Sequence, residues 1–326
     1  MFNTFKKALA AGLVAAIALI SHVALAEDFP SKPLRIIVPF NPGGGVDTVA
    51  RIIADNLREN LGAEIIVENK PGGSGMIGAN AVVKAAPDGY TVLLGSAGEA
   101  AINEFVYKKI QYSPTEDLAP ITLVARIPNV MVLSPKVPAN TMEEFVAYAK
   151  ENPGMTYGTS GIGNSQHLNG ALLAGMSGLD MVQIPYKGAS KQLVDVASGD
   201  VDMTFVSYTA ARGFITDGKV KALAITAAER AQFDKNIPAI AEYAPLSNYQ
   251  LENWFGMFAP AGTPADIVDK LNGAIVAALN NDELATKLQN MGGQPAPMTV
   301  AEFTAFLATE RAQFAEIVKK AGISVE

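Results

Sequence analysis

Short apolar runs alternate with longer amphipathic segments along most of this chain. Residues 34–40 form the first apolar run, and in the segment 47–61 apolar residues recur three and four positions apart, as on one face of a helix. Asp47 stands where such a helix would have its N-cap. The pattern continues with strands predicted at 64–68 and 90–94 and helices predicted at 76–86 and 99–107. This alternation predicts an α/β fold built on parallel sheet.

A proline-marked region then interrupts the alternation. Five prolines fall between residues 114 and 138, a density that helices do not tolerate, and the apolar runs 121–125 and 129–133 are predicted to be extended. The earlier pattern then returns, with helices predicted at 142–151, 166–176 and 190–198 and strands at 155–157, 181–184, 201–205 and 221–226. A second extended segment, 253–259, is followed only by predicted helices, at 265–279, 283–291 and 300–320.

These elements predict two α/β lobes joined by two extended crossings, near residues 125 and 252. The expected boundaries are 27–125 together with 253–326 for lobe 1, and 126–252 for lobe 2. The alternative is two independent domains in tandem, which would need only one crossing. The C-terminal stretch also has no predicted strands around which a third core could form. Two crossings predict a hinge. Trp254, in the second crossing, is expected to pack in the core or hinge.

The N-terminus has the pattern of a secretory signal peptide. Lys6 and Lys7 precede an uncharged stretch of thirteen residues, 8–20, and an A-x-A cleavage pattern ends at Ala26. A retained membrane anchor is the alternative, but this stretch is shorter than the roughly 20 residues that a spanning helix needs. We therefore expect 1–26 to be a signal peptide cleaved after Ala26, and the mature protein to be periplasmic without membrane insertion.

Composition narrows the possible functions. The 326 residues include no cysteine and two histidines, and the formal net charge is −7. Without cysteine there are no disulfides, thiolate metal sites or thiol nucleophiles. An acidic balance argues against nucleic-acid partners, which need a surplus of Lys and Arg. His167 would be the one histidine left after cleavage, and alone it cannot build a zinc site, so no metal is expected.

Three consecutive glycines, Gly43, Gly44 and Gly45, lie between the first predicted strand and helix. Glycine lets backbone N–H groups approach a ligand, and a helix N-terminus adds partial positive charge, so an anion could bind there without a basic side chain. A nucleotide P-loop is disfavoured because no lysine follows at the required spacing. A tight turn is the alternative, although one glycine would suffice for it. The G-x-G-x-x-G match at 73–78 lacks an acidic residue at the ribose position, so no cofactor is predicted.

A similar Gly/Ser loop, 158–165, precedes the helix that carries His167 in the second lobe. Ligands of open α/β sheets bind beyond the carboxyl ends of the strands, and the loops there face each other across the predicted cleft. The candidate ligand-binding residues are Phe40, Gly43, Gly44, Gly45, Asp47, Ser96, Ala97, Gly98, Thr159, Ser160, Gly161, Ser165, His167, Tyr186, Lys187, Gly188 and Ser207.

A serine hydrolase that uses Ser160 or Ser165 with His167 as base is a second possible function. The G-x-S-x-G nucleophile motif fails here, because Ile162 stands where the last glycine belongs. A histidine that hydrogen-bonds a ligand or the backbone is the favoured interpretation, and the protein is not expected to be an enzyme.

Several motifs give the chain a resemblance to a known family. They lie at 33–47, 67–72, 85–91 and 184–188, and at the two crossings, 119–125 and 254–264. Through them the chain resembles the substrate-binding components of tripartite tricarboxylate transporters, also called Bug proteins, over essentially the whole mature length.

The resemblance implies a two-lobed periplasmic-binding-protein fold, type II-like, that closes as a monomer on a small organic carboxylate and delivers it to the membrane components of the transporter. In the family the carboxylate is held by main-chain groups and bridging waters of the two loops. Many members carry an acidic residue where this chain has Val206, Ser207 and Tyr208, which disfavours an amino-acid ligand here. A protein that presents its ligand to a membrane sensor is the remaining alternative.

Overall fold

The structure is a computed structural model that describes residues 29–324 apart from 232 and 291. The predicted signal peptide and its cleavage site lie outside the described residues. The chain divides into two units, 1–31 and 32–326, and the description below concerns the second.

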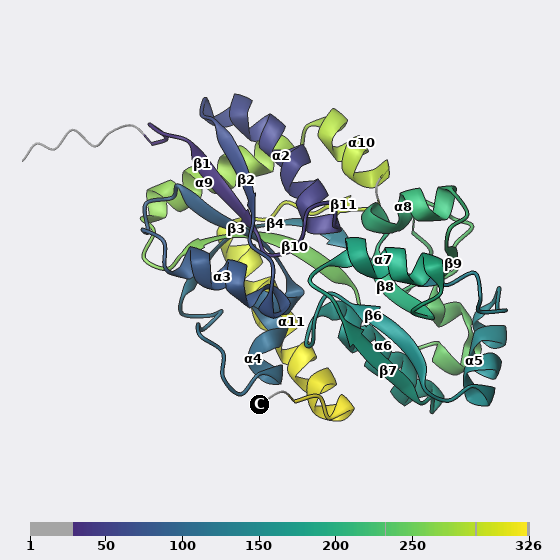
Figure 1. The fold of residues 1–326 in the computed structure, drawn as a ribbon. Coiled ribbons are helices and arrows are strands. Elements are labelled where there is room, and N and C mark those ends of the chain that lie inside the picture. Colours follow the sequence, from purple (N-terminus) through teal and green to yellow (C-terminus); the bar gives the residue numbers. More distant parts are fainter. Residues whose placement is uncertain (1–28, 232, 291, 325–326) are drawn as a thin grey trace, which may run out of the picture. The chain divides into compact units, whose positions relative to one another are not determined.

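A six-stranded sheet forms the first lobe, shown by the purple, blue and light-green strands of Figure 1. Its strands, in the order in which they pair, are β11 (Gln294–Pro295), β4 (Leu118–Ile127), β10 (Asn253–Pro260), β3 (Thr91–Ser96), β1 (Leu34–Val38) and β2 (Ile65–Asn69). The pairs of β1 with β2 and with β3 are parallel, whereas β10 runs antiparallel to both β3 and β4.

A five-stranded sheet forms the second lobe and repeats this plan. Its strands, in pairing order, are β7 (Met181–Pro185), β6 (Met155–Thr159), β8 (Met203–Ser207), β5 (Asn129–Leu133) and β9 (Lys221–Ile225). β6 is parallel to β7 and β8, and β5 runs antiparallel to β8 and β9. The two-lobed α/β fold predicted from the sequence is confirmed, with antiparallel strands in each sheet beside the parallel ones.

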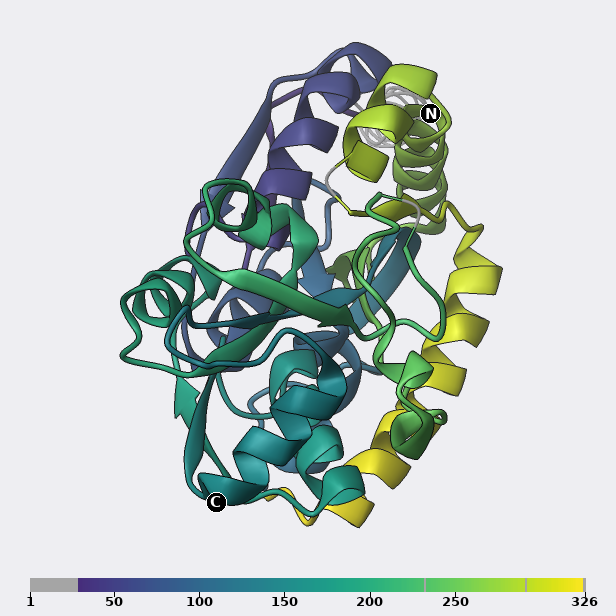
Figure 2. The same cartoon turned by 90° about the vertical axis from the view of Figure 1, so that its right-hand side faces the viewer.

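Helices follow most of the strands and cover the sheets. The helices are α2 (Gly45–Leu61), α3 (Met76–Val83), α4 (Asn103–Val106), α5 (Met142–Glu151), α6 (Ser165–Ser177), α7 (Ala189–Ser198), α8 (Tyr208–Thr216), α9 (Ala265–Leu279), α10 (Asp282–Asn290) and α11 (Val300–Ala321). Short turns of helix also occur at η1 (Gly73–Gly75), η2 (Gly98–Ile102), η3 (Ile240–Glu242) and η4 (Ala244–Leu246). In Figure 2 the yellow α11 runs along one side of the molecule, where it contacts β4 of the first lobe and α6 of the second.

The chain crosses between the lobes twice. β4 leads through Pro128 directly into β5, and the segment after β9 returns to the first lobe as β10. Trp254 at the start of β10 is buried, as expected: its indole N–H donates to Glu310 at 2.8 Å and its ring packs edge-on against Phe303. The second crossing is therefore anchored in the apolar core that α11 covers.

Several predicted elements need correction. α2 begins at Gly45, so Asp47 lies in its first turn and is not the N-cap, which is Gly44. The helix expected at 99–107 is present over 98–106, where a π-helical turn, η2, leads directly into the short α4. The strand expected at 201–205 begins two residues later, since Val201 still bonds to the end of α7.

One helix and one strand were missed, besides the short turns η1, η3 and η4. α8 follows β8 directly, in a segment for which the sequence predicted no helix. The C-terminal stretch was expected to contain only helices, but β11 adds two residues to the edge of the first sheet by pairing with β4. The residues of β11 lie beside Gly292 and Gly293, and such a short strand has too few residues to show the alternation that reveals longer ones.

Candidate functional site

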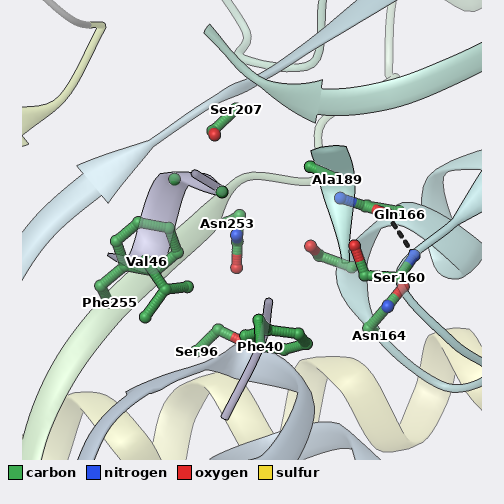
Figure 3. Close-up of a pocket in the computed structure, with 13 residues that line it drawn as sticks. Phe40, Val46, Ser96, Ser160, Asn164, Gln166, Ala189, Ser207, Asn253 and Phe255 are labelled. Atoms are coloured by element: carbon green, nitrogen blue, oxygen red, sulfur yellow. Dashed lines mark hydrogen bonds between the residues drawn. The ribbon is translucent and has the colours of Figure 1, made fainter. Parts of the chain in front are cut away.

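A pocket opens between the lobes at the carboxyl ends of the parallel strands. It encloses about 440 Å³ of empty space, part of which is open to solvent. The residues that line it are Phe40, Gly44, Gly45, Val46, Ser96, Asn253 and Phe255 from the first lobe, and Ser160, Asn164, Ser165, Gln166, Ala189 and Ser207 from the second. Figure 3 shows Val46 and Phe255 on one side of the space and Ser160, Asn164, Gln166 and Ala189 on the other.

Three helices begin at this pocket without a side-chain cap. The N-cap residues of α2, α7 and α8 are Gly44, Gly188 and Ser207, and none of them makes a side-chain hydrogen bond to its helix. The first N–H groups of a helix have no intrahelical partner, and the helix dipole places partial positive charge there. The uncapped N–H groups of these three helices and the positive potential at their N-termini favour binding of an anion in the pocket.

Amide side chains of α6 add further donors. The Oδ1 atom of Asn164 accepts the N–H of His167 at 3.0 Å, while its Nδ2 atom is buried without a partner. The Oε1 atom of Gln166 accepts from the Ser160 N–H at 2.6 Å and from Gln192 at 3.2 Å. Because that oxygen is fully used, the Nε2 atom of Gln166 is the group left for a ligand, and it faces the pocket in Figure 3.

The pocket has no charged wall. Among the described residues that line it, none carries an ionisable side chain. Phe40, Val46 and Phe255 give it an apolar side, and Asn253 beside them keeps a buried Oδ1 atom without a partner. An anionic head at the helix N-termini, with an apolar body against the aromatic rings, fits this distribution of groups.

Asp47 holds the glycine loop in place from behind. Its carboxylate accepts the Gly43 N–H at 2.9 Å, the Asn69 amide at 2.9 Å and the guanidinium of Arg51. Burial alone would raise the pKa of Asp47, but these hydrogen bonds and the charge of Arg51 hold it below its usual value. Asp47 is therefore ionised and shapes the loop without lining the pocket.

Glu99 lies directly behind the pocket wall. Its side chain is fully buried, and its carboxyl group accepts from both the N–H and the hydroxyl of Ser96, the latter at 2.9 Å. Burial raises the pKa of Glu99 to about 7, even though the hydrogen bonds from Ser96 lower it. The protonated and the ionised forms of Glu99 are thus both populated near neutral pH.

The lobes touch around the pocket. The hydroxyl of Ser190 donates to the carbonyl of Pro42 at 2.8 Å, and Tyr107 donates to the carbonyl of Ile162 at 2.7 Å. A Cβ on Gly45 would overlap with the hydroxyl of Ser207 across the cleft. The glycine loop therefore serves close approach of the lobes as well as access of N–H groups to the pocket.

The pocket brings together a part of the predicted site. The predicted residues that line it are Phe40, Gly44, Gly45, Ser96, Ser160, Ser165 and Ser207. The predicted residues that lie around it without lining it are Gly43, Asp47, Ala97, Gly98, Thr159, Gly161, His167, Tyr186, Lys187 and Gly188. Among these, Tyr186 donates to Asp195 at 2.7 Å, and the hydroxyl of Thr159 donates to the carbonyl of Gly161 at 2.7 Å. A ligand contact of the residues in this second group stays a prediction.

His167 supports the loop of the second lobe. Its Nδ1 atom accepts the Gly163 N–H at 3.1 Å, and its ring lies 6.4 Å from that of Tyr157, centroid to centroid. Burial lowers the pKa of His167 to about 4, so the imidazole is neutral. Within the described residues, no hydrogen bond joins it to Ser160 or Ser165.

Six lining residues were not among the candidate ligand-binding residues: Val46, Asn164, Gln166, Ala189, Asn253 and Phe255. Asn164 and Ala189 adjoin predicted residues, and an Asn at the start of a helix is a common N-cap, so the loop pattern could have included them. Asn253 and Phe255 had no such signal, because they stand in an apolar strand that was interpreted as core. In the described part of the chain, no group of three or more His, Asp or Glu side chains is placed to hold a metal ion.

Comparison with known proteins decides the family. Residues 49–323 match the family described as "Tripartite tricarboxylate transporter family receptor". The chain belongs to this receptor family. The receptor is 32% identical to Protein BugT of Bordetella pertussis over 317 residues, 97% of each chain.

Solved structures agree with this assignment. An R. palustris protein solved with adipate is 33% identical, covers 91% of the receptor and 100% of its own chain, and has a TM-score of 0.89. MatC from Rhodopseudomonas palustris, solved with malate, is 30% identical with a TM-score of 0.83, and covers 89% of the receptor and 100% of its own chain. Among the described residues, none of the receptor's helices combines the length and apolar character that crossing a membrane requires.

Proposed function

We propose that this receptor binds a small organic carboxylate in the pocket between its lobes and delivers it to the membrane components of a tripartite tricarboxylate transporter. The observation that carries the proposal is the meeting of three uncapped helix N-termini, those of α2, α7 and α8, at one pocket without basic side chains. Adipate and malate, found in two similar structures, are both carboxylates, which supports the same ligand class here.

Binding of this kind needs no chemistry. A few hydrogen bonds to a charged group contribute about 1.5–3 kcal/mol each, and helix ends add roughly 0.3–1 kcal/mol. These terms can reach the roughly 8 kcal/mol of a micromolar site after the entropic cost of association. We therefore propose a binding protein that releases its ligand unchanged. Because the Nδ1 atom of His167 accepts the Gly163 N–H and Nε2 then carries the ring proton, the imidazole offers no free acceptor to a serine hydroxyl, which supports this over a hydrolase.

The proposal includes the protein's location and its motion. We propose that it acts in the periplasm after cleavage behind Ala26, as a monomer whose lobes, 27–125 with 253–326 and 126–252, close about the crossings at Pro128 and before β10. The family match supports a transporter as the partner. A sensor partner would use the same pocket, and capture of a transporter component distinguishes the two.

A thermal-shift screen of mono-, di- and tricarboxylates, aromatic ones included, tests the proposal. We expect a carboxylate to raise the melting temperature and the matching diamide, which has the same shape without the charge, to leave it unchanged. Equal shifts with acid and amide, or none with any carboxylate, would refute carboxylate binding. Hydrolysis of the matching ester that is lost in His167→Asn would favour the hydrolase instead.

A further inference from the structure

A buried carboxyl group controls the hydroxyl that Ser96 can offer to a ligand. Ser96 lines the pocket at the end of β3, and Figure 3 places it beside Phe40 at the pocket's edge. Behind it, the fully buried Glu99 accepts hydrogen bonds from both the N–H and the hydroxyl of Ser96. The only hydrogen on the Ser96 oxygen is therefore used by Glu99 when this carboxyl group is ionised.

The direction of this hydrogen bond decides whether Ser96 presents a hydrogen-bond donor or only acceptors to the pocket. With Glu99 ionised, Ser96 turns only lone pairs toward the pocket, and these repel a carboxylate. With a proton on Glu99, its O–H can donate to the Ser96 oxygen, and the Ser96 hydrogen becomes free to donate to a ligand. One proton on the buried group thus reverses the polarity of a pocket-lining hydroxyl and removes a negative charge from behind it.

We propose that Glu99 and Ser96 link ligand binding to a proton, so that the receptor takes up its carboxylate together with one proton that resides on Glu99. The inference rests on the proposed function and deepens it, because it names Glu99 as the residue that couples binding of the anion to binding of a proton. Glu99 does not touch the ligand and acts through Ser96 as a positioning residue.

Within the part of the chain that the structure describes, no cationic side chain contributes to the pKa of Glu99. From η1, Gly75 packs so closely that a Cβ there would lie 2.8 Å from Oε2, and β3 and β10 contain no titratable residue. The Tyr112 hydroxyl donates to the Glu99 carbonyl at 2.7 Å, and burial together with nearby carboxyl groups raises the pKa of Tyr112 well above its usual value, so it stays neutral. α4 and α11 also pack against η2, and their charged side chains Glu104 and Arg311 are paired with each other.

The direction in which pH changes the affinity follows from the charges of Glu99 and of the ligand. Burial raises the pKa of Glu99 to about 7 in the free protein. A bound carboxylate brings a second negative charge near it and raises this pKa further. Binding above neutral pH therefore draws a proton from solution, and affinity falls with rising pH. Well below neutral pH, Glu99 is already protonated and binding is independent of pH.

Titration calorimetry with adipate and malate, in buffers of different ionisation enthalpy from about pH 6 to about pH 9, tests the inference. We expect wild type to take up close to one proton on the alkaline side, with affinity falling by up to about tenfold per pH unit. Glu99→Gln mimics the protonated state, since Oε1 can accept from the Ser96 N–H and Nε2 can donate to its hydroxyl. We expect it to take up no proton and to bind with constant affinity.

Glu310→Gln is the matched control, because Glu310 also has a raised pKa through burial but bonds to Trp254 outside the pocket. It should keep the wild-type proton uptake. Normal binding by wild type without proton uptake would overturn the linkage, as would uptake that persists in Glu99→Gln. The wild-type measurement decides even if Glu99→Gln does not fold. No binding of any carboxylate in the thermal screen would instead overturn the proposed function, and the linkage with it.

Discussion

Asp47 and Glu99 are both buried carboxyl groups of the first lobe, and their partners give them opposite properties. Asp47 accepts hydrogen bonds from a guanidinium, an amide and a backbone N–H, which hold its pKa low. Glu99 accepts from Ser96 and from its own backbone N–H but has no guanidinium partner among the described residues, and burial raises its pKa to about 7. Since ionisation in a buried site requires compensating donors or charge, Asp47 is a permanent anion and Glu99 a titratable one.

Loss of the Asp47 charge should loosen the glycine loop. We expect Asp47→Asn to lower the free energy of unfolding by about 1–3 kcal/mol, because the Gly43 N–H and the Arg51 guanidinium lose a charged acceptor. The pKa of Asp47 is lowered in the folded state, so its contribution is present above its unfolded pKa of about 4 and is lost as pH falls below it. Urea unfolding of wild type and variant at neutral and acidic pH measures both effects.

Asp55→Asn provides the control for this variant. Asp55 lies on the same helix, α2, but its side chain is 74% exposed. A surface substitution of this kind should change stability by less than about 0.5 kcal/mol. Equal effects of the two variants would show that the network around Asp47 does not stabilise the loop.

Glu99 should make the free receptor less stable as pH rises. Its pKa is about 7 when folded and near 4.5 when unfolded, so the stabilising contribution is complete below the unfolded value and is lost as pH rises through the folded one. Between about pH 5 and pH 8 we expect wild type to lose roughly 3 kcal/mol relative to Glu99→Gln. Parallel stability profiles of the two proteins over this range would show that Glu99 is ionised throughout.

At the scale of elements, regular segments were predictable and irregular ones were not. α5 and α9 have the predicted bounds because each runs from a clear start to a clear end in a strongly periodic segment. α8 was missed although it is nine residues long, since a glycine interrupts its pattern and it follows β8 without a loop. η2 is wound as a π-helix, a local widening that a 3.6-residue period does not reveal.

The candidate site also has a part that the sequence predicted and a part that it did not. Loops between a strand and a helix were recognisable by glycine and serine, and these supplied Gly44, Gly45, Ser160 and Ser165 to the pocket. Phe255 lines the same pocket but belongs to β10, whose apolar sequence was interpreted as core. The alternating sides of a strand can face a core and a cavity, and only the packed lobes show which side is which.

The loop before α2 should admit the ligand only while Gly44 lacks a side chain. A Cβ on Gly44 would meet only the Asn41 carbonyl, at an ordinary distance of 3.6 Å, so Gly44→Val should fold while filling space at the pocket. We expect its affinity for adipate or malate to fall at least tenfold, about 1.4 kcal/mol, by calorimetry. Gly273→Val in α9, where a Cβ meets nothing within 4 Å, is the control. Unchanged binding by Gly44→Val would exclude the loop from the site.

At the scale of the whole described unit, the sheets of the two lobes have similar strand orders. In each sheet the parallel strands take the same order, β2-β1-β3 and β7-β6-β8, and one antiparallel strand, β10 or β5, pairs beside them. β5 and β10 each directly follow a crossing between the lobes. The carboxyl ends of both parallel sets consequently point into one space, where the uncapped helices α2, α7 and α8 begin.

This arrangement predicts that the ligand closes the lobes. The contacts of Ser190 with Pro42 and of Tyr107 with Ile162 join the two sides of the cleft, and they are expected to break when the lobes open. In X-ray scattering we expect the radius of gyration of wild type to fall when a binding carboxylate is added. An unchanged radius at saturation would argue against closure.

A side chain at Gly45 should prevent that change. Its Cβ would overlap with the Ser207 hydroxyl and reach the Phe255 ring at 3.4 Å, so Gly45→Val acts as a wedge at the line where the lobes meet. We expect this variant to keep the larger radius in the presence of ligand and to bind it weakly, while its helical circular dichroism stays that of wild type. Gly273→Val should close normally. Full closure of Gly45→Val would mean that the lobes do not approach through the glycine loop.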